Sequence, residues 1–220
     1  MTAIPTLSLL ETRVLGVLVE KQHTVPDSYP LTLNALVGGC NQKSSRDPVI
    51  EATEADVQVA VDHLRQLSLV VESSGGRVMR YAHNVAKVLG VPTESVALLA
   101  TLMLRGAQTS GELRINAERL HRFADISSVE AYLAELAQRA AGSLVVELPR
   151  APGARESRWA HLLSGEPPLP SASPAADAAP PAVAAGELAA LKHNLDTLGR
   201  EVAELRALLE RLLSELGVRR

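Results

Sequence analysis

The sequence predicts a mainly α-helical α+β protein with small β-hairpins, built from two similar parts. The phrases LVVE and RYAH, at 69–72 and 80–83, recur as LVVE and RWAH at 144–147 and 158–161. Three segments with helical spacing of apolar residues precede each pair of phrases. Self-similarity at a long interval indicates a duplicated structural unit. Three helices followed by a hairpin is the order of a winged helix, so we expect two winged helices in tandem.

The first domain is predicted at 1–90. Glu11 follows Ser8 at capping-box spacing, so a first helix is expected to begin there. A polar loop, EKQHTVPDSYP, then leads to a short second helix at 31–37, which Gly38-Gly39 is expected to end.

The third helix of this domain is predicted to start after Thr53. Its apolar residues recur with a period of 3.6, at Val57, Ala60, Val61, Leu64 and Leu67. The run LVVESSGGRVMRYAH then predicts a hairpin with a Ser/Gly turn. Since side chains alternate along a strand, we expect Tyr81 to pack on the third helix and Arg80 to face solvent.

The second domain, predicted at 91–165, repeats this order and ends in the hairpin LVVELPRAPGARESRWAHL. Capping residues set the expected helix ends: Thr93 and Gly106 for the first helix, Thr109 with Glu112 for the second, and Ser127 with Glu130 for the third.

The C-terminal quarter differs in composition. Residues 166–186 hold six prolines and eight alanines, which predicts a disordered linker. Residues 187–220 predict a coiled-coil helix that joins two chains in parallel, with folding back onto the same chain as the alternative. Its apolar seam is Leu188, Leu191, Leu195, Leu198, Val202, Leu205, Leu209, Leu212 and Leu216.

Composition narrows the function classes. The 22 basic and 25 acidic residues leave no basic excess of the kind that nucleic-acid binders usually carry. Cys40 is the single cysteine and the six histidines are dispersed, so we expect no metal site, no cofactor and no enzymatic activity. The chain shows no signal peptide and no apolar run long enough for a bilayer, which predicts a cytoplasmic protein without membrane contact.

Several phrases resemble those of the YceH family, bacterial proteins of unassigned function. They are VEKQ at 19–22, YPLTLN at 29–34, CNQKSSRDPV at 40–49, LRGAQTSGELR at 104–114 and PGARESRWAHLLSGE at 152–166. The resemblance covers residues 8–166 and implies two winged helices. It implies no catalytic residue and no ligand.

Six basic residues are candidate contacts to nucleic acid: Lys43, Arg46, Arg77, Arg80, Arg155 and Arg158. The first two lie in the polar loop before the third helix and the others in the hairpins, regions that approach phosphates or a minor groove in DNA-bound winged helices. The alternative is that the loop charges are solvated and that Arg80 and Arg158 form cross-strand pairs with Glu72 and Glu147.

The N-terminal turns of the third helices are acidic, which opposes an approach to phosphates. Glu51, Glu54 and Asp56 lie there in the first domain, and Asp125 and Glu130 in the second. Two hypotheses therefore remain, a dimeric regulator that binds double-stranded DNA and a scaffold that binds an unknown protein partner. The winged-helix fold favours the first by analogy, and the near-neutral charge favours the second. We expect the DNA-binding regulator and keep the scaffold as the alternative.

Overall fold

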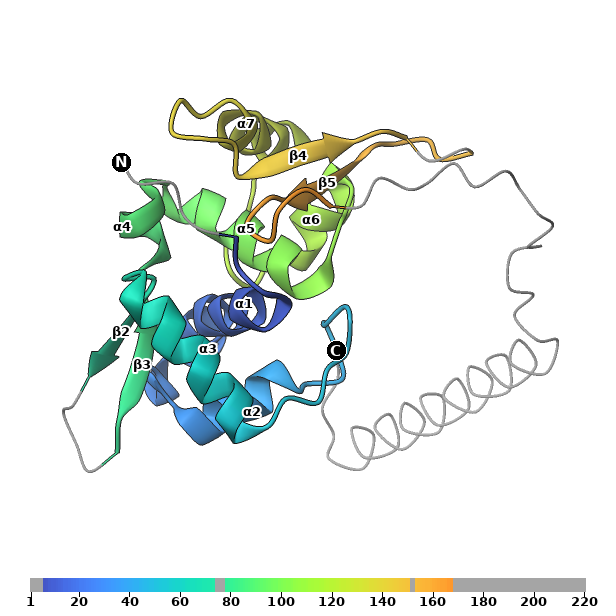
Figure 1. Ribbon diagram of the computed structural model, residues 1–220. Helices are drawn as coiled ribbons and strands as arrows, with labels where there is room; N and C mark the ends of the chain where they lie inside the picture. The colour runs from blue at the N-terminus through green and yellow to red at the C-terminus, as the bar shows by residue number, and fades with distance from the viewer. Residues whose placement is uncertain (1–5, 74–77, 151–152, 168–220) are drawn as a thin grey trace, which may run out of the picture. The chain divides into compact units, whose positions relative to one another are not determined.

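The computed structural model describes residues 6–73, 78–150 and 153–167 as helices joined to two small antiparallel sheets (Figure 1). The first half contains α1 (Leu9–Thr24), a 3-10 turn at Pro26–Ser28, β1 (Leu31–Thr32), α2 (Leu33–Cys40), α3 (Glu54–Gln66), β2 (Val70–Ser73) and β3 (Arg80–His83). The second contains α4 (Val85–Leu89), α5 (Thr93–Arg105), α6 (Ser110–Asn116), α7 (Ile126–Ala137), β4 (Val145–Leu148) and β5 (Arg158–His161).

Three helices start at the capping residues that the sequence predicts. The capping boxes that open α1, α3 and α6 are formed by Ser8 with Glu11, Thr53 with Asp56, and Thr109 with Glu112. The predicted start of α7 was wrong, because the Asp125 carboxylate accepts from the Ser128 N–H and opens the helix two residues before Ser127.

Three local predictions for the first half were wrong. Helix α1 continues through the expected loop to Thr24. Thr32 caps α2, and Gly38-Gly39 lies inside that helix. Gly39 meets Val17 of α1 so closely that a Cβ would lie 2.5 Å from Val17 Cγ1, so this glycine allows two helices to touch. In the second half, helix α6 ends at Asn116, and the short helix α4 was not predicted.

The repeated phrases form two hairpins with the same register. Glu72 lies opposite Tyr81 in one, and Glu147 lies opposite Trp159 in the other. Each aromatic residue is also paired on its other side: Leu31 of strand β1 pairs with Tyr81, and Gln108, which belongs to no strand, makes an isolated bridge to Trp159. The duplication therefore extends to a short pairing that neither phrase contains.

Helices α1 and α5 pack against each other, so the two halves share one hydrophobic core (Figure 1). Gly16 of α1 permits the contact, because a Cβ there would lie 2.8 Å from Leu104 Cγ of α5. Residues 6–167 as described fall within one compact unit, and nothing in them separates 1–90 from 91–165 as independent domains. The predicted linker from 168 onward and the predicted coiled coil lie outside the described residues.

Among the residues that the structure describes, no helix has the length and apolar character needed to cross a membrane.

Candidate functional site

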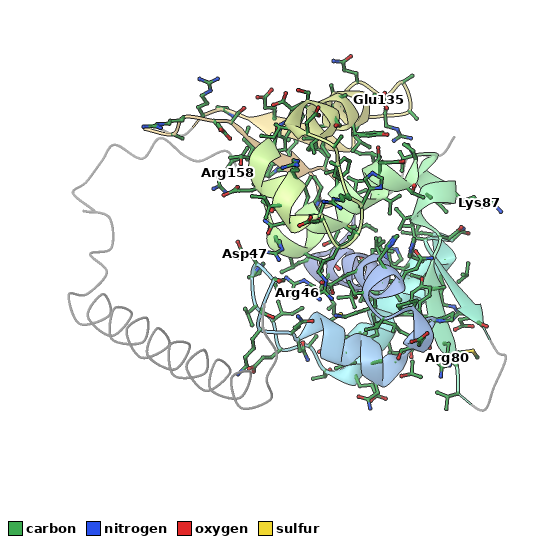
Figure 2. All side chains as sticks on the ribbon, turned by 180° about the vertical axis from the view of Figure 1, so that it is seen from behind. Arg46, Asp47, Arg80, Lys87, Glu135 and Arg158 are labelled. Atoms are coloured by element: carbon green, nitrogen blue, oxygen red, sulfur yellow. The ribbon has the colours of Figure 1, made fainter. Side chains whose placement is uncertain are left out.

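The loop between α2 and α3 holds the first pair of candidate residues, and it buries one of them. The Arg46 side chain is fully covered, and its Nη1 and Nη2 donate to the two carboxylate oxygens of Glu20 on α1, at 3.2 and 2.6 Å. Its Nε donates to the Gly39 carbonyl at 3.2 Å. Arg46 thus holds the loop onto α1 and α2. The expectation that it contacts a phosphate is wrong for this conformation, because the guanidinium is directed inward (Figure 2).

A second buried arginine, Arg13 of α1, clamps the same loop. Its Nη1 donates to the Cys40 carbonyl at 3.2 Å and its Nη2 to the Pro48 carbonyl at 2.6 Å, at the two ends of the loop. Burial raises the pKa of Glu20, but its bonds to Arg46 and Lys21 outweigh burial and leave the pKa below its usual value. The carboxylate therefore stays charged at neutral pH, as the pair with Arg46 requires.

A polar cavity of about 300 Å³ lies where this loop meets the second half. The Asp47 N–H donates to the Leu104 carbonyl at 2.8 Å, and Arg105 Nη2 donates to Ser45 Oγ at 2.7 Å. Three of the phrases that resemble the YceH family meet here, through Ser45, Arg46, Asp47, Arg105, Ala107, Gln108, Glu112 and Arg158, and Asn116 completes the lining. Because most of these groups already bond one another, we interpret the cavity as a joint between the halves.

Arg80 and Arg158 are exposed, and both bind the main chain of their own half. Arg80 Nη1 donates to the Pro30 carbonyl at 2.8 Å, and Arg158 Nη1 donates to the Ala107 carbonyl at 2.8 Å. Arg158 also pairs with Glu112 at 3.1 Å. The alternative of cross-strand pairs with Glu72 and Glu147 was wrong, because each glutamate lies opposite the aromatic residue of its hairpin.

Of the other candidates, Lys43 and Arg155 are exposed. Arg77 lies outside the described residues, as do the leucines and valine of the predicted coiled coil. Of the five described candidate cations, Arg46 and Arg158 line the same polar cavity, and only four, Lys43, Arg80, Arg155 and Arg158, are exposed.

The exposed faces of the third helices carry acids and apolar side chains. Glu54, Asp56 and Val59 are exposed on α3, and Val59 keeps 70% of its surface in solvent. Helix α7 exposes Glu130 and Glu135, and its sequence, ISSVEAYLAELA, contains no basic residue. These are the faces that would approach a DNA groove in a winged helix.

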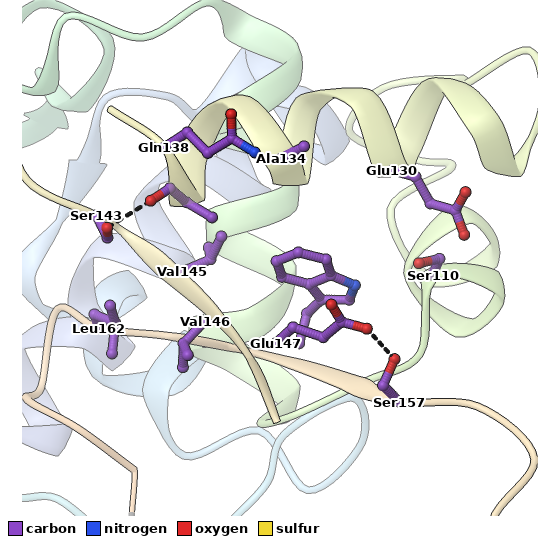
Figure 3. Close-up of a pocket in the computed structure, with 12 residues that line it drawn as sticks. Ser110, Glu130, Ala134, Gln138, Ser143, Val145, Val146, Glu147, Ser157 and Leu162 are labelled. Atoms are coloured by element: carbon purple, nitrogen blue, oxygen red, sulfur yellow. Dashed lines mark hydrogen bonds between the residues drawn. The ribbon is translucent and has the colours of Figure 1, made fainter. Parts of the chain in front are cut away.

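A groove of about 590 Å³ lies between α7, the β4–β5 hairpin and the start of α6 (Figure 3). Glu130 and Gln138 border it from α7, and Glu147 borders it from β4, where its carboxylate accepts a hydrogen bond from Ser157 Oγ. The half-buried Trp159 also lines it, together with Ser110, Ala134, Ala137, Ser143, Val145, Val146 and Leu162. Two of the twelve lining residues are acidic and none is basic.

The sequence did not single out this groove as a site. It named Glu147 only as a possible partner of Arg158. A position-by-position comparison of the two repeats would have shown that the residues facing the two hairpins differ. The size of the groove and the distances between its lining residues come only from the packed structure.

His83 and His161 are half-buried and Cys40 is buried, and burial favours the neutral form of all three. Burial lowers the pKa of His83 to about 4, with His23 adding to this, and burial lowers the pKa of His161 to about 4. Both are neutral at pH 7 and lie at the ends of their hairpins. Burial raises the pKa of the Cys40 thiol to about 12, so it is protonated and unreactive. In the described part of the chain, no three His, Cys, Asp or Glu residues are placed to share a metal ion.

Comparison with known proteins places these features in a family. A family described as "Protein of unknown function, DUF480" matches residues 7–154. The chain belongs to this family. The resemblance to the YceH family is confirmed by relatives named only as UPF0502 proteins.

Three UPF0502 relatives show how much of the chain is shared. The protein of Dechloromonas aromatica is 60% identical, over 93% of this chain and 95% of its own length. That of Methylibium petroleiphilum is 61% identical, over 98% and 92%. One from Burkholderia pseudomallei is 56% identical, over 98% and 92%. None of these names states an activity, so the exposed surfaces of this DUF480 protein are the basis for its proposed function.

Proposed function

We propose that this protein is a non-enzymatic, cytoplasmic protein-interaction module made of two winged helices. Each half has the order of three helices and a hairpin, with a third strand beside the first hairpin and an isolated bridge beside the second, which supports the winged-helix assignment. We propose that the faces formed by the third helices and the hairpins bind a partner protein. The alternative is that they bind double-stranded DNA.

The exposed faces of α3 and α7 carry this proposal. A helix that enters a DNA groove is surrounded by phosphates, and acidic side chains such as Asp56 and Glu130 are repelled by them. The only arginine exposed on α3, Arg65, is paired with Asp62 at 3.2 Å and with Glu72 at 2.7 Å. Exposed apolar side chains on the same helices, Val59 and Ile126, are typical of protein interfaces.

Nuclease treatment distinguishes binding to a partner protein from binding to DNA. We expect a partner protein to co-purify with the full chain from cells equally well with and without nuclease. Val59→Glu should remove that partner while the fold, followed by circular dichroism, is unchanged. Lys43→Ala is the matched control, because Lys43 is exposed but lies outside the α3 face, and it should retain the partner.

If the protein binds DNA, the opposite results are expected. A DNA-binding regulator would bind duplex fragments with an affinity that falls steeply with salt. Lys43→Ala and Arg155→Ala would then weaken binding to all sequences about equally, because these exposed cations would contact phosphates. Such salt-dependent binding, with the co-purified protein lost after nuclease treatment, would overturn the interaction-module proposal.

We also propose that residues 187–216 join two chains as a parallel coiled coil. The support comes from the sequence, where leucines and one valine fill the seam at alternating spacings of three and four. Light scattering is expected to give the mass of a dimer for the whole chain and of a monomer for a variant that ends at Gly186. Equal monomeric masses at tens of micromolar would mean that the segment does not associate.

A further inference from the structure

The two halves can be superimposed residue by residue at the end of the third helix, because the same main-chain hydrogen bond occurs in both. The Leu69 N–H donates to the Leu64 carbonyl at 2.9 Å, and the Leu144 N–H donates to the Leu136 carbonyl at 3.0 Å. Leu64 and Leu136 are therefore equivalent. The next residue is Arg65 in the first half and Ala137 in the second.

In the first half, Arg65 fills the space between the third helix and the hairpin. Its guanidinium bonds the carboxylate of Glu72 on β2 at 2.7 Å and that of Asp62, one turn back on α3, at 3.2 Å. The aromatic residue opposite Glu72 is Tyr81, which is buried and donates its hydroxyl to Gln58 of α3 at 3.4 Å. One arginine side chain thus satisfies the hairpin glutamate.

The second half keeps the glutamate and the aromatic ring but lacks the arginine. Ala137 replaces Arg65, and Ala134 replaces Asp62 at the position three residues earlier. Glu147, Trp159 and Glu130 occupy the positions of Glu72, Tyr81 and Gln58, and all five second-half residues line the groove beside α7. The groove is lined by methyl groups at the two positions where the first half has an arginine and an aspartate. Its carboxylates remain, and Glu147 is exposed with only the Ser157 hydroxyl as a described partner.

We propose that this groove binds an arginine side chain from a partner protein, in the place that Arg65 fills in the first half. Charge complementarity supports it, since the lining holds two carboxylates and no cation. A guanidinium is planar, forms paired hydrogen bonds with a carboxylate and stacks on an indole face, so Glu147 and Trp159 together suit it better than an ammonium group. The inference rests on the proposed interaction function and specifies the chemistry of the partner.

The chain's single tryptophan, Trp159, lies in the groove and reports binding by fluorescence. The full chain is titrated with a capped pentapeptide, Ala-Leu-Arg-Leu-Ala, and with the same peptide carrying uncharged citrulline in place of arginine. We expect a saturable fluorescence change with the arginine peptide that weakens as salt is added. The citrulline peptide should bind about tenfold more weakly than the arginine peptide. This is the loss of affinity expected when one charge-assisted hydrogen bond is removed.

Two variants and one matched control locate the binding. Glu147→Gln should weaken the arginine peptide about tenfold, since it removes the charge with little change in shape. Ala137→Arg should abolish binding, because it restores the first half's own arginine. Ala131→Arg adds the same charge to the exposed side of α7, outside the groove lining, and should bind as the natural chain does. Circular dichroism and urea unfolding confirm that each variant is folded.

Several outcomes would overturn the inference. They are an absence of saturable change, equal binding of the arginine and citrulline peptides, or unchanged binding by both Glu147→Gln and Ala137→Arg. Binding that appears only after arginines 200, 206, 211, 219 and 220 are replaced by glutamine would assign the groove to the chain's own C-terminal segment, and would also overturn it. If a partner protein co-purifies in the presence of nuclease but the arginine peptide does not bind, this inference is wrong and the proposed function still stands.

Discussion

Arg46 and Glu20 form a two-pronged ion pair that fixes the polar loop to the first helix, with N–O distances of 3.2 and 2.6 Å. The Arg46 side chain has no exposed surface, and Glu20 keeps 15% of its side-chain surface in solvent. Removing one partner of a buried pair leaves the other charge without compensation. The pair is therefore part of the folded core and is not available to a ligand.

Replacing Arg46 by Met is expected to lower the free energy of unfolding by about 3–5 kcal/mol, because the largely covered Glu20 carboxylate loses both bonds to Arg46 and keeps only its pair with Lys21. Lys43→Ala, in the same loop but exposed, should change it by about 0.5 kcal/mol or less. Urea unfolding at pH 7, followed by circular dichroism, measures both. Equal, small effects would show that the pair contributes nothing beyond a surface contact.

Two adjacent glycines in α2 are expected to respond in opposite directions to alanine. A Cβ at Gly39 would lie 2.5 Å from Val17 Cγ1, whereas a Cβ at Gly38 would meet nothing within 4 Å. Gly39→Ala should lower the free energy of unfolding by about 1–3 kcal/mol through overpacking. Gly38→Ala should raise it by about 0.5–1 kcal/mol, because alanine restricts the unfolded chain and favours the helix. If both variants were stabilised, the close α1–α2 contact would be refuted.

The two hairpin histidines should make the protein less stable in mild acid. Burial lowers the pKa of His83 and His161 to about 4, whereas an unfolded histidine titrates near 6.5. Between these values the unfolded chain binds more protons than the folded chain. The stability that the two neutral histidines contribute is thus complete above about pH 6.5 and is lost as the pH falls toward 4.

We expect the free energy of unfolding to fall by on the order of 1–3 kcal/mol per histidine between pH 7.5 and 4.5. Urea unfolding across this interval measures the change. Replacing His83 and His161 together by Gln should flatten the dependence, while His121→Gln serves as the control and should leave it in place. A dependence that survives the double replacement would assign it to other groups.

The elements predicted best are those that depend on residues close in sequence. A capping box needs Thr53 and Asp56 three residues apart, and both groups satisfy free N–H donors of one helix end. The hairpins follow from alternating β-branched runs around a turn, and their identical register follows from the repeated phrases.

The elements predicted worst depend on contacts between distant segments. Gly38-Gly39 resembles a helix end, but Val17 of α1 supplies the reason for glycine inside α2. Arg46 resembles a solvent-facing loop cation, but Glu20, 26 residues earlier, takes up its charge. Neither partner can be identified from spacing along the chain.

The sequence by itself determined that the described chain is helical with small antiparallel hairpins, that its halves are related, and that it belongs to the DUF480 family. These properties depend on local hydrogen bonding, periodicity and the order of residues. Only the tertiary structure decided that α1 and α5 pack together, that Arg46 is buried, and that alanines at 134 and 137 line a groove beside Trp159. The reason is that burial and charge pairing depend on the distance between side chains, which is set by packing among segments far apart in sequence.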